Sequence, residues 1–128
     1  MKGLNRGDAR FLFDALNVHI VRSFLEAATE KKIITTWDIA KSFHWGKDLS
    51  HFTGKQRHRF FSQRAFMVRG RLLSMAEEGI IRIDKENEED VFTLLVERVG
   101  ISKYRIQGKP RSMLMIRSKN EKWAMYEL

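Results

Sequence analysis

A long stretch of this chain carries basic side chains and no acidic ones. Between Leu49 and Ala76 there is no Asp or Glu, while the same segment contains Lys55, Arg57, Arg59, Arg64, Arg69 and Arg71. A solvated helix face normally mixes both signs of charge, because opposite charges three or four residues apart stabilise the helix. The lack of acids over more than about six turns therefore favours contact with phosphate over an ordinary solvent-exposed surface.

The side chains of this segment also suit recognition of bases. Arg pairs with the edge of guanine and Gln with that of adenine, so Arg59, Arg64, Gln56 and Gln63 are candidates for base contacts, while the other cations would neutralise phosphates. Two apolar residues on the same side, Phe60 and Met67, contact thymine methyl groups or pack on the preceding loop. The predicted DNA-binding residues are Lys55, Gln56, Arg57, Arg59, Gln63, Arg64, Met67, Arg69 and Arg71.

A second segment without acids runs from Arg98 to Asn120. It is a candidate for a secondary contact with a nucleic-acid backbone. Strand residues alternate between two sides, so only part of the segment can face one ligand. The residues predicted for this contact are Arg98, Lys103, Arg105, Lys109 and Arg111.

The sequence gives only weak indications of metal binding or catalysis. His44, His51 and His58 recur every seven residues, but the glycines and serine among them indicate a loop, so we expect no metal site. We find neither a Ser-His-Asp arrangement nor a glycine-rich phosphate loop, and we expect a protein that is not an enzyme and uses no cofactor. The three tryptophans are expected in the core or at an interface.

Composition points to a polyanionic partner. The 128 residues include 24 Lys and Arg against 16 Asp and Glu, which gives a net charge of +8. Nucleic acid is the leading partner and an anionic membrane the second. The chain has no cysteine, which excludes disulfides and thiolate zinc sites. We find no apolar run long enough to span a membrane and no secretory signal, so we expect a cytoplasmic, chromosome-associated protein.

Hydrophobic spacing predicts three helices. The first runs from a cap at Asp8 to about Ala28, and its wide apolar stripe indicates either a central core helix or a helix shared with a second subunit. A short strand fragment at 33–35 precedes a helix over 37–43 that a Thr35/Asp38 capping box opens. After a loop at 44–52, a Thr53/Gln56 capping box opens a helix over 54–78, which is continuous or broken near Ser62.

The third helix has a predicted core face and a predicted reading face. The core face comprises Phe61, Ala65, Val68, Leu72 and Met75, joined at its edge by Phe66 and Leu73. The opposite side presents Gln56, Arg59, Phe60, Gln63, Arg64, Met67 and Arg71.

Strand-forming residues dominate the remainder of the chain. Strands at 80–83 and 91–96 flank a polar loop at 84–90, and further strands are expected at 102–107, 113–117 and 122–127 with a turn at 108–110. We therefore predict an α+β fold with a domain at 1–97 and a C-terminal β extension at 98–128, a hairpin or small antiparallel sheet, packed on that domain.

Two segments resemble the winged helix-turn-helix superfamily. Ile34-Thr35-Thr36-Trp37-Asp38-Ile39-Ala40-Lys41 is similar to the small strand and first helix of the turn motif. The segment from Val68 to Ile81, VRGRLLSMAEEGII, looks like the end of a recognition helix that runs into the first wing strand. The resemblance covers about residues 8–96 and implies a core of three helices plus a wing hairpin.

This resemblance implies that the helix from Thr53 or Ser62 to Glu78 enters the major groove, with the wing along the backbone or minor groove. The sequence departs from the pattern in two respects. The segment from His44 to Phe61 is longer than the usual tight turn, and the wing tip is acidic. Phosphate would repel the tip, which contains Asp84, Glu86, Glu88, Glu89 and Asp90, so we expect the wing to point away from DNA.

The sequence thus predicts a dimeric transcriptional regulator that binds double-stranded DNA with some sequence preference and reads the major groove with residues 53–78. The alternative is a winged-helix protein-interaction or RNA-binding module within a larger assembly, with the acidic wing facing a protein partner.

Overall fold

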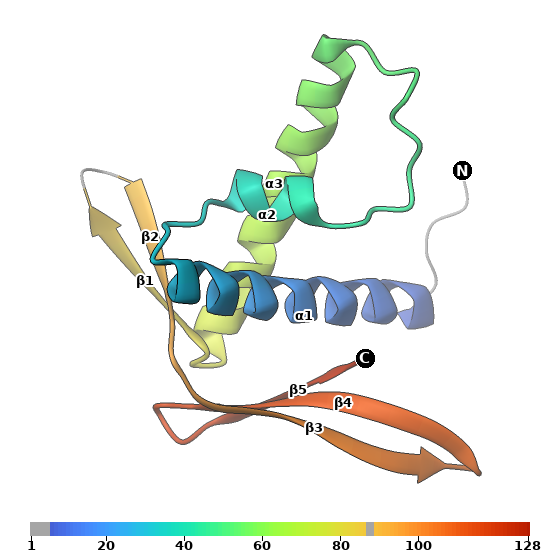
Figure 1. The fold of residues 1–128 in the computed structure, drawn as a ribbon, viewed down its shortest axis with the longest axis vertical. Coiled ribbons are helices and arrows are strands. Elements are labelled where there is room, and N and C mark those ends of the chain that lie inside the picture. Colours follow the sequence, from blue (N-terminus) through green and yellow to red (C-terminus); the bar gives the residue numbers. More distant parts are fainter. Residues whose placement is uncertain (1–5, 87–88) are drawn as a thin grey trace.

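A computed structural model describes residues 6–86 and 89–128. Three helices are followed by a two-stranded hairpin and a three-stranded antiparallel sheet, so the fold is α+β (Figure 1). The elements are α1 (Arg6–Glu30), α2 (Thr36–Ser42), α3 (Gly54–Glu77), β1 (Ile81–Glu86), β2 (Glu89–Leu94), β3 (Val96–Ile106), β4 (Lys109–Ser118) and β5 (Trp123–Glu127).

The helices follow the sequence pattern, with corrections at their ends. α1 begins at Arg6, so Asp8 lies inside the helix and not at its cap. The predicted strand fragment at 33–35 is wrong, because these residues form neither helix nor strand. At α2 the predicted capping box is confirmed: Thr35 Oγ1 accepts from the Asp38 amide at 3.1 Å, and the Thr35 amide donates to the Asp38 carboxylate at 3.2 Å.

α3 is one continuous helix of 24 residues, without a break at Ser62. Its predicted capping box is confirmed as well, since the Thr53 amide donates to Gln56 Oε1 at 2.8 Å and Thr53 Oγ1 accepts from the Gln56 amide at 3.1 Å. The helix ends in a Schellman arrangement, in which Gly79 has a φ of +81° and the amide of Ile80 donates to the Met75 carbonyl at 2.9 Å. The chain then enters β1 directly.

The strands extend into the segment that was predicted to be an acidic loop. β1 and β2 pair antiparallel from Ile81↔Leu94 to Glu86↔Glu89, so the acidic residues at 84–86 and 89–90 belong to the ladder. Residues 87–88, including Glu88 of the predicted tip, lie outside the described part of the chain. β3, β4 and β5 form the second sheet in that order, and β3 and β4 are longer than predicted.

α1 is the central element of the core. Figure 1 shows α2 and the amino-terminal half of α3 on one side of α1 and the sheet β3-β4-β5 on the other. Buried side chains of α1, including Leu16 and Ile20, belong to one cluster with Leu72 of α3, Ile116 of β4 and Tyr126 of β5. Most of the wide apolar stripe of α1 is filled within this chain, as expected of a central core helix, whereas Phe13 and Leu25 of the same stripe are 37% and 39% exposed.

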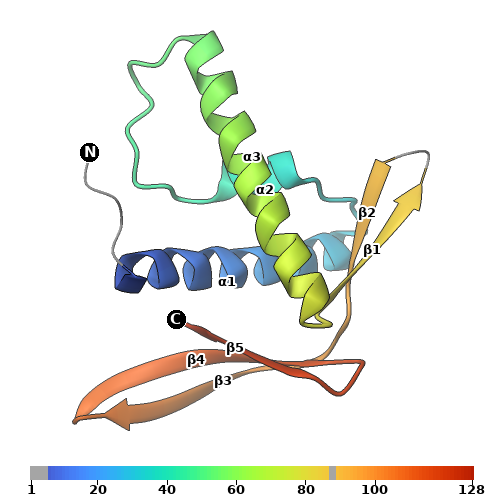
Figure 2. The ribbon, with the colours of Figure 1, turned by 180° about the vertical axis from the view of Figure 1, so that it is seen from behind.

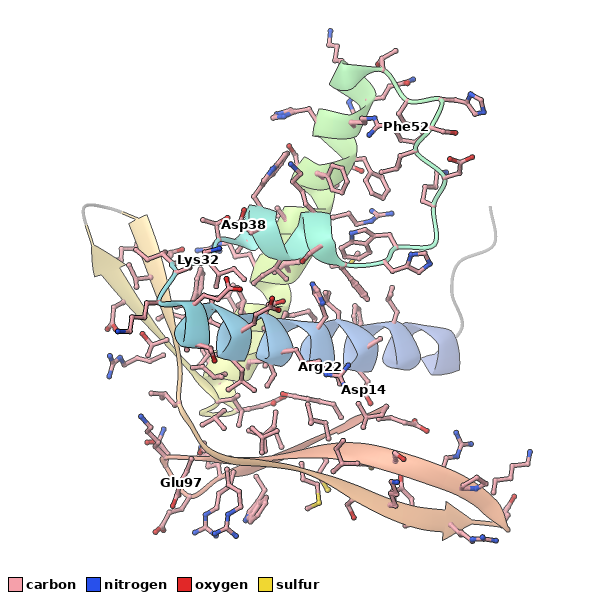
Figure 3. The ribbon with its side chains drawn as sticks, viewed as in Figure 1. Asp14, Arg22, Lys32, Asp38, Phe52 and Glu97 are labelled. Atoms are coloured by element: carbon pink, nitrogen blue, oxygen red, sulfur yellow. The ribbon has the colours of Figure 1, made fainter. Side chains whose placement is uncertain are left out.

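Polar contacts connect α1 to both of its neighbours. The His19 ring nitrogen Nε2 lies 3.2 Å from the Ile39 carbonyl and 2.9 Å from Ser42 Oγ at the end of α2. On the opposite side, Asp14 accepts a hydrogen bond from the Glu127 amide of β5 at 3.1 Å, and Figure 3 places Asp14 on the side of α1 that faces this strand.

Two further observations concern the classes of protein considered from the sequence. Within residues 6–86 and 89–128, no helix is long and apolar enough to cross a membrane. Over the same residues, no group of three or more His, Asp or Glu side chains is placed to hold a metal ion.

Candidate nucleic-acid interface

The inner side of α3 carries three arginines, Arg57, Arg64 and Arg71, which contact the rest of the chain. A spacing of seven residues is about two helical turns, so the three side chains leave the helix on one side. Arg57 donates to the Leu49 carbonyl at 2.9 Å, whereas Arg71 donates to Asn17 Oδ1 at 3.1 Å. These residues hold the loop at 43–53 and helix α1 against α3.

Arg64 has a similar position on the inner side. Its guanidinium lies 4.4 Å from the centroid of the Phe60 ring and 5.2 Å from that of Trp45. Arg71 likewise lies over Phe13 at 4.9 Å. Guanidinium groups that stack on aromatic rings stabilise the packing of those rings, so part of the predicted DNA-binding set has a structural role.

The solvent-exposed side of α3, called here the outer face, differs from the predicted reading face by about a quarter of a turn. Phe66 was predicted at the edge of the core but is 77% exposed at the middle of this face, and Leu73 is 41% exposed. Phe60 was predicted on the reading face but is buried, and Met67 packs against the core. The outer face comprises Lys55, Arg59, Ser62, Gln63, Phe66, Arg69, Gly70 and Leu73.

The cause of this rotation is the segment at 43–53, which folds back along the side of α3 that carries Phe60. Phe52 of this segment packs edge-on against the Phe60 ring, with centroids 6.1 Å apart, and Figure 3 places Phe52 between the segment and α3. A helical pattern shows which residues share a side but not which loop covers that side. Apart from the contact of Arg69 with Asp90, the outer face is exposed, and Figure 2 shows α3 crossing in front of α1 and α2.

The hairpin β1-β2 lies beside α3 and contacts its outer face at one point. Arg69 donates to the Asp90 carboxylate at 2.7 Å, and Lys85 of β1 lies 3.9 Å from the same carboxylate. The hydrogen bond from Arg69 lowers the pKa of Asp90 below its ordinary value. Asp84 is also paired, with Arg82 at 2.8 Å. Asp84 and Asp90, two residues of the predicted acidic wing tip, are therefore each paired with an arginine.

The outer face and the predicted secondary contact are not brought together. Arg98, Lys103, Arg105, Lys109 and Arg111 are exposed on β3 and β4, on the side of α1 away from α2. The register places Arg98 and Arg111 on one face of the sheet and Lys103 and Arg105 on the other. Arg111 is also paired with Glu127 at 2.9 Å.

Four predicted residues meet in a small pocket between the loop at 43–53 and the amino-terminal half of α3. Gln56, Arg59, Gln63 and Arg64 line it together with Phe52, Phe60 and Lys47. Lys47 was not predicted as a site residue, because it precedes the segment without acids and is followed by Asp48. Only the fold of the loop places it opposite α3.

Comparisons with family models, curated proteins and solved structures find no match to this chain. The assignment of function therefore depends on the chain's own geometry.

Proposed function

We propose that this chain is a winged helix-turn-helix protein that binds double-stranded DNA as a transcriptional regulator and reads the major groove with the outer face of α3. The observation that carries the proposal is that the outer face of α3 is exposed. Between Lys55 and Leu73 this face presents cations, an amide and an aromatic ring, and the helix contributes no carboxylate to it. The inner arginines have structural contacts, so the proposed contact surface is smaller than the basic segment of the sequence.

The dimensions of α3 suit this role. Its 24 residues span about 36 Å, and a helix of this diameter fits the major groove, which is about 12 Å wide. Recognition helices direct their amino-terminal residues at base edges. On α3 these residues include Arg59 and Gln63, which suit guanine and adenine, and Phe66 follows one turn later as a candidate contact for a thymine methyl group.

The order of elements agrees with the same proposal. α2 and α3 form the helix pair, and the β1-β2 hairpin occupies the position of the wing directly after α3. Because Arg82 and Arg69 neutralise two wing carboxylates, repulsion between the hairpin and DNA is weaker than the sequence indicated. We retain the expectation that the acidic tip points away from the duplex.

The proposal includes a homodimer, because regulators of this type bind two half-sites through a two-fold axis. Because most of the apolar side of α1 is covered within the chain, we place the dimer contact on another surface. Trp123 and Met125 are more than half exposed on the face of the β3-β4-β5 sheet that points away from α1. Sedimentation equilibrium with wild type and Trp123→Ser tests this part of the proposal.

A second candidate is the protein-interaction module, which a different surface favours. A groove of about 850 Å³ lies between the end of α1, the α1–α2 connection and β2. Its lining is largely apolar, and one lining residue, Ile33, is 92% exposed. An apolar groove with such an exposed residue is typical of a protein-docking surface. If this candidate is correct, Ile33→Asp should abolish the binding of a protein partner to the groove. The DNA-binding proposal expects the same variant to bind duplex DNA as tightly as the wild type.

The decisive experiment replaces one cation on the outer face and a matched cation elsewhere. Arg59→Ala should weaken binding to duplex DNA and lower the slope of log affinity against log salt by about one unit, because one phosphate or base contact is lost. Arg22→Ala makes the same charge change on α1, where Arg22 is exposed, and should leave both quantities nearly unchanged.

Fluorescence anisotropy on random duplex, single-stranded DNA and RNA over a salt series measures both quantities. Equal losses for the two variants, or an affinity of the wild type that does not depend on salt, would contradict the proposal. Preference for RNA over duplex DNA would favour the RNA-binding alternative.

A further inference from the structure

The pocket between the loop at 43–53 and α3 collects positive charge without a carboxylate. It encloses about 260 Å³. Its rim contains three cations, Lys47 of the loop and Arg59 and Arg64 of α3, together with the amides of Gln56 and Gln63. Among the described residues, no Asp or Glu lines the pocket. Bringing like charges together raises the free energy of the folded chain, and an anion in the pocket would reverse this effect.

The nearest acidic residue in the sequence is engaged elsewhere. Asp48 follows Lys47, but its carboxylate accepts a hydrogen bond from the Ser50 amide at 2.9 Å. This turn directs the carboxylate to its own loop, and Asp48 is not among the residues that line the pocket. The positive charge of the pocket is therefore not balanced from within the loop.

Arg64 is held in place by aromatic packing and leaves donors unused. Its guanidinium stacks between Phe60 and Trp45, and its Nε is buried. In the part of the chain that the structure describes, no acceptor reaches this Nε. A planar guanidinium is well suited to an oxyanion, and because Arg64 lines the pocket, its guanidinium can donate to an oxyanion bound there.

The pocket is small and open to solvent. Phe52 and Phe60 form the apolar part of its lining. The volume is smaller than the about 300–1,000 Å³ of pockets that enclose drug-sized ligands. A group of the size of a phosphate, carried on a larger molecule that extends into solvent, fits this space.

We propose that the pocket formed by Lys47, Arg59 and Arg64 binds a phosphate group. The group belongs either to the backbone of bound DNA or to a free phosphate ester. The first case rests on the proposed function, because the outer face of α3 would then be in the groove while the loop at 43–53 holds the flanking strand. The second case is independent of DNA binding.

The test uses Lys47→Ala, because Lys47 lies on the loop and not on α3, and Lys119→Ala as the matched control. Lys119 is exposed in the turn between β4 and β5 and has no part in either proposal. Each variant is titrated with inorganic phosphate at constant ionic strength, with the Arg64 Nε–H resonance as the readout in ¹⁵N-labelled protein. The Arg117 Nε–H group, which lies 3.7 Å from a Glu97 carboxylate oxygen and does not line the pocket, serves as an internal reference.

A saturable shift of the Arg64 resonance that disappears in Lys47→Ala but not in Lys119→Ala supports a free phosphate ester. If inorganic phosphate has no effect, the backbone case predicts that Lys47→Ala alone lowers the salt slope of duplex binding by about one unit. The inference is overturned if Lys47→Ala matches Lys119→Ala in both measurements. Failure of the wild type to bind any duplex would contradict the proposed function and leave the phosphate titration as a separate test.

Discussion

At the scale of single side chains, two apolar residues on α3 have opposite environments. Leu72 is fully buried and Phe66 is 77% exposed, although the sequence pattern assigns both to the core side. Single exposed apolar side chains are common at protein surfaces, so the proposed role of Phe66 depends on its place among the cations of the outer face. Substitution of each residue by Ala should therefore affect different properties of the protein.

Leu72→Ala should reduce the free energy of unfolding by about 2–5 kcal/mol, because it removes buried contacts and leaves a cavity. Phe66→Ala should change the unfolding free energy little but should weaken duplex binding and reduce the preference for sites with thymine at the contacted position. Urea denaturation and anisotropy on a selected site measure the two effects. A Phe66→Ala variant as unstable as Leu72→Ala would show that Phe66 is part of the core.

At the scale of secondary-structure elements, the contact between α3 and the β1-β2 hairpin engages one cation of the outer face. Arg69 belongs to that face, yet its guanidinium is bound to Asp90 of β2 at 2.7 Å. A DNA phosphate would have to compete with this carboxylate. The ion pair therefore holds the hairpin beside the helix, and under the proposed function it would lower the affinity of the outer face for DNA.

Asp90→Asn should tighten duplex binding by a few-fold at physiological salt and by more at low salt, because it frees Arg69 and removes a negative charge near the outer face. Asp84→Asn is the matched control, since Asp84 is paired with Arg82 instead. Both affinities are measured by anisotropy over a salt series. Weaker binding by Asp90→Asn would mean that the ion pair is needed to position Arg69.

For the whole molecule, His19 connects the stability of the helical core to pH. Its ring bridges α1 to the end of α2, and burial lowers its pKa below the ordinary value of 6.5. Arg22 opposes its protonation as well, while the Ile39 carbonyl and Glu26 favour it. Because the folded-state pKa is below the unfolded one, the unfolded chain binds this proton first as the pH falls.

The free energy of unfolding should therefore be constant above pH 6.5 with respect to this group and should fall as the pH decreases toward the folded-state pKa of His19. His19→Gln should remove this loss, and chemical denaturation at several pH values between 7 and about 5 tests it. The lowered carboxyl pKa values of Asp48 and Asp90 act below 3.8 and do not overlap with this range. Equal pH dependence of variant and wild type would assign the effect to other groups.

The sequence by itself determined most of the helix starts and ends and the net charge of the chain. Three helix-end signals are local, because each depends on residues within a few positions of the helix end: the capping boxes at Thr35 and Thr53 and the glycine stop at Gly79. The helix starts and the helix end predicted from these signals agree with the structure to within one residue. The net charge of +8 and the segment without acids likewise depend on composition alone.

Only the tertiary structure decided which face of α3 meets solvent and which cations remain free. The loop at 43–53 covers Phe60 and Arg64, α1 engages Arg71, and the wing engages Arg69. Helical periodicity identifies residues on one side of a helix, but an arginine can pack its stem and stack its guanidinium on a ring as readily as it binds phosphate. The partners that decide between these roles are distant in sequence, so their contacts follow from the packing of the chain.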